Sequence, residues 1–220
     1  MKQVTYDVRA INKDGKVVIT KTFKKKGKLL DFFRRAVERF RKVIVKRQVT
    51  KQKFTIVPSE DWGIRDHTAY SYAGPVDTIF IHTSVTTQLE ASAKKNDEKA
   101  QMRSVDNIAF GRGFNGFSYS FGVFPSGRGY EGRGWNVVEA ATAPYNEESD
   151  SISFIGNTDV FDPTEAQFEA IIAIIKDGQR RGKVTANATI RFHREVAPKA
   201  CPGAKVTEAH RRRIQRGVSQ

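Results

Sequence analysis

The chain contains a single cysteine, Cys201, among its 220 residues, and this excludes a whole class of folds. One thiol cannot form an internal disulfide, so the chain is no disulfide-stapled scaffold and must rest on a buried apolar core. With 39% hydrophobic and 28% charged residues, its composition is that of a globular protein. The length suits one well-filled domain with a small appendage. No apolar run in the sequence approaches the roughly 20 residues that cross a bilayer.

The residues around Cys201 indicate a ligand loop. The segment His193–Gly203 places Ala-Pro-Lys-Ala before the cysteine and Pro-Gly after it, with a histidine at its start. A lone cysteine is usually a small buried hydrophobe, but these turn-forming neighbours place this one in a loop. Such a loop can bring a thiolate and an imidazole to one ion. Zinc accepts both ligand types, and a catalytic zinc site needs three protein ligands plus a water.

A third candidate ligand, His82, lies upstream at the end of an apolar run. Val76–Ile81 is short and mostly apolar, which predicts a buried strand, and His82 follows it directly. The predicted strand Thr189–Phe192 leads into His193 in the same way. A lone histidine is more often a satisfied core or surface residue. Together with the loop around Cys201, however, His82 completes a possible zinc site.

The formal net charge of +14 is concentrated near the N-terminus. Residues 1–58 hold 18 of the 38 lysines and arginines but 4 of the 24 acidic residues, whereas the rest of the chain is balanced. This asymmetry indicates an appendage that meets a polyanion, with nucleic acid, an anionic membrane surface and an acidic cell-wall polymer as candidates. A well-solvated basic domain without such a partner is the plain alternative.

Residues 1–58 are predicted to fold as a small basic ββα or ββαβ module. Two segments in which apolar and polar residues alternate flank the turn sequence Asn12–Gly15, and this pattern predicts a hairpin. An apolar stripe at spacings of three and four then predicts a helix. The predicted elements are the strands Val4–Ile11 and Lys16–Phe23, the helix Leu29–Val43, and further strand residues at Val43–Val45 and Phe54–Val57. Nothing in this module matches a named nucleic-acid motif.

Four segments of the remaining chain resemble one family in its own order. The family is that of the peptidoglycan-recognition proteins and type-2 N-acetylmuramoyl-L-alanine amidases, including the phage lysozyme-type amidases. The segments are Phe80–Ser84, Phe117–Phe121 with Ser126–Asn136, Tyr145–Asn146 with Ser151–Asn157, and His193–Gly203. They correspond to the first zinc-ligand strand, the central hairpin, the next strand and the closing ligand loop. The resemblance covers residues 59–206 and leaves residues 1–58 outside.

The resemblance implies an α/β fold with a mixed central β-sheet flanked by helices and zinc in a groove on one side. Residues 59–220 would form this domain and end in a short basic C-terminal tail. The local pattern agrees, because it predicts a hairpin at 121–131 and a helix over Asp97–Phe110. A second helix is predicted to begin after Thr164, with Gln167 completing the cap, and to stop at Gly182.

The resemblance also implies the chemistry. A zinc ion held by His82, His193 and Cys201 would keep one position for water, lower the pKa of that water towards roughly 7, and polarise an amide carbonyl. The amide would join the lactyl group of N-acetylmuramic acid to L-alanine. Tyr119 corresponds to the family's tyrosine beside the metal water, and Lys199 to the lysine that stabilises the oxyanion. A core tyrosine and a solvated lysine are the alternatives for these two residues.

The chain departs from the family pattern at three places. Thr83 stands where many relatives have a second histidine after the first ligand. Gly116 replaces an aspartate often found three residues before the tyrosine, and Ala141 lies near a position where a histidine is common. We therefore expect different contacts to the stem peptide. The paired cysteines of animal recognition proteins are also missing, as expected for a bacterial or phage member.

These observations together predict a zinc amidase acting on bacterial peptidoglycan, of the phage endolysin type. The N-terminal sequence lacks the apolar core of a signal peptide, so we expect the protein to be made in the host cytoplasm. We also expect it to be a monomer and to act on the cell wall. Residues 1–58 would then contact the wall or the membrane. Two alternatives stay open: a module that binds peptidoglycan without cutting it, and an amidase whose basic part also binds nucleic acid or a polymerase.

Overall fold

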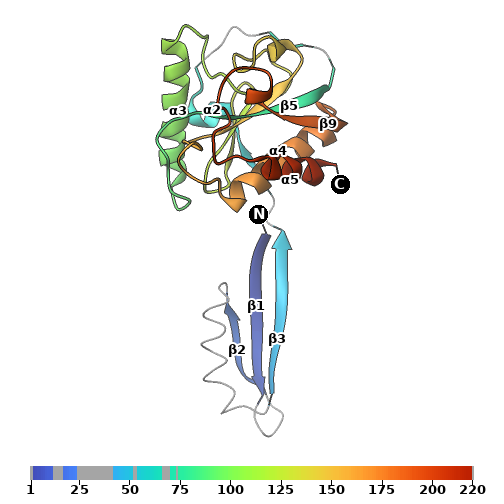
Figure 1. The fold of residues 1–220 in the computed structure, drawn as a ribbon. Helices are drawn as coiled ribbons and strands as arrows, with labels where there is room; N and C mark the ends of the chain where they lie inside the picture. Colours follow the sequence, from blue (N-terminus) through green and yellow to red (C-terminus); the bar gives the residue numbers. More distant parts are fainter. Residues whose placement is uncertain are drawn as a thin grey trace. The chain divides into compact units, whose positions relative to one another are not determined.

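A computed structural model describes residues 2–11, 17–23, 42–51, 54–65, 70–72 and 74–219 (Figure 1). The chain divides into two compact units, Met1–Lys53 and Phe54–Gln220. Among the described residues, no helix is both long and apolar enough to cross a membrane.

The first unit contains a three-stranded antiparallel sheet. Its strands are β1 (Lys2–Ile11), β2 (Val17–Phe23) and β3 (Lys42–Lys51), in the order β2-β1-β3. The β1–β2 pair confirms the predicted hairpin. The predicted helix Leu29–Val43 lies outside the described residues up to residue 41, and its last two residues begin β3 instead.

The second unit is built on a six-stranded mixed sheet with the order β4-β7-β6-β8-β5-β9. Most neighbours run parallel, whereas β6 and β7 form the predicted antiparallel hairpin. The strands are β4 (Ile56–Val57), β5 (Val76–Thr83), β6 (Phe121–Val123), β7 (Gly129–Glu131), β8 (Asp150–Phe154) and β9 (Val184–Phe192). Strand β4, which the sequence pattern grouped with the N-terminal module, pairs with β7 of this sheet. The prediction of a mixed central sheet flanked by helices is confirmed.

In the described part of this unit, four α-helices accompany the sheet. They are α2 (Ser59–Trp62), α3 (Lys95–Gly111), α4 (Glu165–Arg180) and α5 (Glu208–Val218). Helices α4 and α5 pack against one face of the sheet. Helix α4 begins as predicted, because the Thr164 hydroxyl accepts from the Gln167 N–H and the Gln167 side chain accepts in return from the Thr164 N–H. The predicted basic tail is helix α5, which buries Ile214 and Val218 in the main core.

The alternation of side chains along β5 separates the core from the opposite face of the sheet. Ile79 and Ile81 pack into the main apolar cluster with residues of α4, α5 and β9. Phe80 and His82 therefore point to the opposite face, since successive side chains of a strand alternate. A second apolar cluster, which includes Trp62 and Met102, joins α2 and α3 to β7. The face that carries His82 is the one on which the candidate site lies.

Candidate functional site

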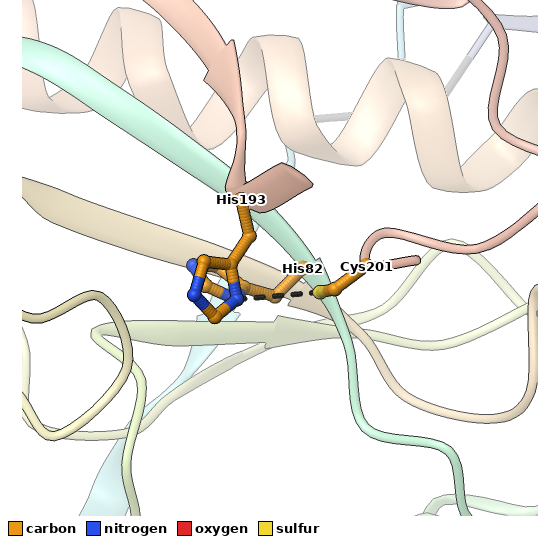
Figure 2. A group of neighbouring side chains, drawn as sticks. All are labelled: His82, His193 and Cys201. Atoms are coloured by element: carbon orange, nitrogen blue, oxygen red, sulfur yellow. Dashed lines mark hydrogen bonds between the residues drawn. The ribbon is translucent and has the colours of Figure 1, made fainter. Parts of the chain in front are cut away.

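Parallel pairing of β5 with β9 brings two histidines together at the ends of neighbouring strands. Ile81 pairs with Phe192 in the register of these strands, so the residues that follow, His82 and His193, are neighbours. Their ring centroids are 4.6 Å apart, and both side chains are buried. Figure 2 shows the two rings beside Cys201. The carboxyl ends of parallel strands are a common place for functional groups, because the sheet holds them in register.

The loop that carries Cys201 is tied down on both sides of the cysteine. The Arg194 N–H donates to the Cys201 carbonyl at 2.8 Å, which folds the loop back towards His193. On the far side, the Thr158 hydroxyl donates to the Pro202 carbonyl at 2.5 Å. These bonds hold the thiol beside the strand ends. The loop thus folds back as its proline and glycine residues predicted.

The three side chains offer a set of donors that fits zinc. One ligand atom from each of His82, His193 and Cys201 lies within 4.8 Å of the others, and the Cys201 Sγ is 3.5 Å from the His82 Nδ1. Zn–N bonds of about 2.0 Å and a Zn–S bond of about 2.3 Å imply tetrahedral ligand separations of about 3.5 Å. The thiol and His82 already meet this spacing, and a small movement of His193 would complete it. Imidazole nitrogen and thiolate sulfur are both zinc ligands, and three protein donors leave the fourth position that a catalytic zinc site keeps for water.

The ring of His82 is oriented by a contact on its other side. The His82 Nε2 lies 2.9 Å from the Thr142 hydroxyl. When Nε2 carries the proton and donates it to Thr142, Nδ1 is free to bind a metal. Burial holds the pKa of His82 well below its ordinary value, and the nearby His193 and Lys199 lower it further. The imidazole is therefore neutral at pH 7, which is the form that binds metals.

The other two donors differ in their electrostatic surroundings. Burial lowers the pKa of His193, with a further contribution from Lys199, so this ring is also neutral. Burial raises the pKa of the Cys201 thiol to about 11, while the Thr83 N–H, 3.4 Å from the Sγ, acts in the opposite direction. A backbone N–H aimed at the sulfur stabilises the thiolate that a metal requires.

Tyr119 packs against this cluster. Its ring centroid is 5.3 Å from that of His82, and the residue lies two positions before the start of β6. Burial raises the pKa of the Tyr119 phenol, so its hydroxyl stays protonated at neutral pH; a hydrogen bond with Ser153 acts in the opposite direction. The structure therefore brings Tyr119 next to the predicted ligands.

Lys199 and His193 line one cavity of about 510 Å³. The Lys199 side chain is exposed, and its charge lowers the pKa values of all three candidate ligands. The other lining residues are Phe114, Glu139, Ala140, Ala141, Ala143, Asn146 and Ala197. Small apolar walls with a few polar groups are typical of a ligand site. The cavity places the ammonium group within reach of a molecule bound beside His193.

Sequence reasoning missed several residues that shape the site. Thr142 and Ser153 contact the candidate residues, and Glu139 and Asn146 line the cavity. None of them stands in a spacing pattern that marks a ligand or a catalytic group. Ala141 lies in the cavity wall, so the chain presents a methyl group near the place where relatives have an imidazole.

Comparisons with known proteins agree on one family. Residues 72–204 match the family model described as N-acetylmuramoyl-L-alanine amidase. Peptidoglycan-recognition protein SC2 of Drosophila simulans is 31% identical over 158 residues, covering 69% of this chain and 82% of the relative. A peptidoglycan recognition protein of Trichoplusia ni is 31% identical over 160 residues, covering 71% of this chain and 86% of the relative.

Solved structures give the same result for the fold. Wild-type Drosophila peptidoglycan-recognition protein LB matches with a TM-score of 0.66 and 27% identity, covering 72% of this chain and 96% of that one. Peptidoglycan recognition protein LE, solved in complex with tracheal cytotoxin, matches with a TM-score of 0.63 and 27% identity. The match covers 67% of this chain and 87% of that one. The family model spans all five residues that the sequence analysis selected, since they lie between residues 72 and 204.

Proposed function

The chain belongs to the N-acetylmuramoyl-L-alanine amidase family, and from this premise we propose that it is a zinc-dependent amidase of peptidoglycan. It would hydrolyse the amide bond between the lactyl group of N-acetylmuramic acid and L-alanine. The observation that carries the proposal is the meeting of His82, His193 and Cys201, whose donor atoms lie within 4.8 Å of one another. A recognition protein that does not cut its ligand has no need of this donor set.

The residues of the chain have separate tasks in this reaction. A zinc ion bound by the three donors would supply Lewis acidity and an activated water. Thr142 holds the ring of His82 in the orientation that leaves Nδ1 free. The protonated Tyr119 hydroxyl can orient the attacking water or exchange a proton with it. Lys199 brings a positive charge to the cavity beside His193, where it can stabilise the negative charge that develops on the amide oxygen.

Peptidoglycan as the substrate is supported by the relatives. Three of the similar solved structures are complexes with tracheal cytotoxin, which one of them describes as monomeric diaminopimelic acid-type peptidoglycan. The cavity beside His193 has a volume of about 510 Å³, which suits part of a muropeptide. We propose that the scissile amide enters between Lys199 and the cluster of His82, His193 and Cys201.

Release of stem peptides from purified sacculi tests the proposal. With zinc present, the protein should release stem peptides that carry a free amino group on their N-terminal L-alanine. This activity should be lost after treatment with a chelator and recovered on addition of zinc. Mass spectrometry of the products identifies the bond that is cut. Binding to sacculi without release of peptides, by protein shown to contain zinc, would favour the non-catalytic alternative.

We extend the proposal to a biological setting, the lysis of a bacterial host by a phage endolysin. The single cysteine supports this setting. The family's animal recognition proteins have paired cysteines, and this chain, with one cysteine, cannot form that disulfide. In this setting the basic residues 1–58 would contact an anionic wall polymer or membrane surface. The purified protein should clear a suspension of permeabilised bacteria, and Cys201→Ser should not. Clearing by the variant at the same rate would contradict this setting.

A further inference from the structure

Glu139 is a fully buried acidic residue that the proposed reaction does not use. It is 3% exposed and lines the cavity that contains His193 and Lys199. Within the described residues, its Oε2 is buried without a hydrogen-bond partner. A buried carboxylate oxygen that receives no donor disfavours the ionised form, because the lost hydration is not replaced.

The other oxygen of Glu139 joins two strands at the point where their pairing ends. Strands β6 and β8 pair from Phe121 and Ile152 onwards, and Ser120 and Ser151 precede these residues. The Glu139 Oε1 accepts from the Ser120 N–H at 2.9 Å and from the Ser151 N–H at 2.6 Å. Both serine hydroxyls also approach this oxygen. The carboxyl group thus bridges the two residues that come just before the β6–β8 pairing begins.

This bridge holds the residue next to Tyr119. Ser120 follows Tyr119 in the chain, and the tyrosine carbonyl accepts from the Arg133 N–H at 3.1 Å. The Ala140 N–H, adjacent to Glu139, donates to the Ser118 carbonyl at 3.1 Å. The backbone on both sides of Tyr119 is therefore bonded to Glu139 or to its neighbour. Movement of this carboxyl group would change how the Tyr119 ring lies against His82.

Burial and a second buried carboxyl group both disfavour the ionised form of Glu139. The Ser120 hydroxyl lies 3.0 Å from the Asp150 Oδ1, so the two acidic groups share this one serine. Burial and then Asp150 raise the pKa of Glu139 to about 8, although the serine donors act in the opposite direction. Burial raises the pKa of Asp150 to about 6. The titratable and charged groups around Glu139 are Asp150, Tyr72, Tyr119 and Arg133, with His193 and Lys199 along the shared cavity.

We propose that Glu139, as a neutral carboxylic acid, is a positioning residue that ties Ser120 to Ser151 and thereby fixes Tyr119 over His82. Its ionisation puts two negative charges on either side of one serine hydroxyl, and their repulsion loosens this bridge. The inference rests on the proposed function only for its effect on the reaction rate. The position of Tyr119 can be followed without any substrate.

The test compares two changes at Glu139 in the zinc-loaded full chain. Glu139→Gln keeps an acceptor oxygen and is neutral at every pH, whereas Glu139→Ala removes the bridge. Glu98→Gln is the matched control, because Glu98 is also fully buried but bonds to Arg128 and Tyr130 at another place in the unit. 4-Fluorophenylalanine incorporated at position 119, which has no ionisable group of its own, reports the ring environment by fluorine NMR.

In the wild type, the fluorine signal should titrate with a midpoint near pH 8. This titration should be absent in Glu139→Gln and unchanged in Glu98→Gln. If peptidoglycan is cleaved, Glu139→Gln should keep kcat at pH 7 within about twofold and exceed the wild type at pH 9. Glu139→Ala should lower kcat by about 10-fold or more with little change in KM, since a small misplacement of a catalytic group is costly.

Three results would overturn the inference. The first is loss of activity in Glu139→Gln at pH 7 with zinc retained, which would mean that the ionised carboxylate is required. The second is a fluorine titration that persists in this variant, and the third is an unchanged signal and rate in Glu139→Ala. If the wild type cleaves no peptidoglycan, the proposed function fails, while the fluorine measurement still decides the role of Glu139. If Glu139→Ala does not fold, the activity and the fluorine titration of Glu139→Gln still test the inference.

Discussion

Two of the three candidate ligands, His82 and Cys201, are held by contacts from neighbouring residues. Thr142 orients the ring of His82, the Thr83 N–H points at the Cys201 sulfur, and the Arg194 N–H binds the Cys201 carbonyl. Such contacts outside the ligands fix their orientation before an ion arrives, which lowers the cost of binding. Changes of one atom at this scale should therefore separate metal binding from the reaction itself.

Replacing the sulfur of Cys201 by oxygen should remove the metal. Cys201→Ser keeps the size of the side chain but replaces a thiolate by a hydroxyl, which is a poor zinc ligand at neutral pH. We expect the zinc content of the purified protein to fall by at least about 10-fold and peptide release from sacculi to be lost. Ala204→Ser, at an exposed position of the same loop, should keep both. Full zinc content in Cys201→Ser, measured by elemental analysis, would contradict this ligand set.

Removing the hydroxyl of Tyr119 should affect the reaction and leave the metal in place. In Tyr119→Phe the ring can still pack against His82, but no phenol remains to orient a water. We expect kcat to fall by about 100-fold, as is usual for loss of a proton-transferring group, with zinc content unchanged. An unaltered kcat would reduce Tyr119 to a packing residue.

At this scale the sequence pattern identifies ligands better than their supports. His82, His193 and Cys201 can be predicted because two follow apolar strands and the third stands among turn residues. Thr142 is separated from His82 by 60 residues, and no local spacing connects them. No local spacing connects Glu139 with Ser151 either. Their contacts depend on the register of strands, which single residue types do not reveal.

Strand register and one tight loop contact place the site at the scale of elements. The β5–β9 register aligns His82 with His193. The ligand loop lies so close to the segment after β8 that a Cβ on Gly203 would be 2.6 Å from the backbone carbon and oxygen of Thr158. Gly203 also has φ +101, a conformation that side chains disfavour. Glycine is therefore required here for two independent reasons.

A methyl group at this position should displace the loop. We expect Gly203→Ala to destabilise the unit by about 2 kcal/mol or more, lowering Tm by roughly 4–8 °C. Zinc content should fall as well, because Cys201 moves with the loop. Gly111→Ala is the matched control, since a Cβ there has no atom within 4 Å and its φ is not positive. Equal melting temperatures for the two variants would show that the loop tolerates the contact.

In the second unit, the helices and strands could be predicted where the spacing of apolar residues is regular. The strand at β5, the hairpin of β6 and β7, and the capped start of α4 agree with the sequence patterns. Helix α5 was missed, because its 11 residues include four arginines and only two of its residues, Ile214 and Val218, are buried. Strand β4 was assigned to the wrong neighbour, since two residues carry no information about which sheet they join.

For the molecule as a whole, the excess positive charge lies in the first unit and the candidate site in the second. The 18 basic residues of the N-terminal region account for the formal excess, while the described core residues and all five candidate site residues belong to Phe54–Gln220. We propose that this division separates attraction to a polyanion from the reaction. The identity of the polyanion could not be predicted, because charge alone does not distinguish a wall polymer, a membrane surface and a nucleic acid.

Deleting residues 1–53 should therefore change binding more than folding or chemistry. We expect the shortened chain to melt cooperatively, to bind zinc, and to cleave soluble muropeptides at the rate of the full chain. Its binding to intact walls should be weaker at low salt, and the difference should vanish near 1 M salt, where charges are screened beyond about 3 Å. Wall binding that is the same for both chains across this salt range would remove the targeting role.

The distance along the chain between two of the candidate ligands has a consequence for folding. His82 and Cys201 are 119 residues apart, and every strand from β6 to β9 lies between them. An ion that joins them would close a long loop, much as a distant crosslink does, and long loops are slow to close by diffusion. Tight capture of the ion would then be a late event. Metal uptake would then report that the strands between the two ligands have already folded.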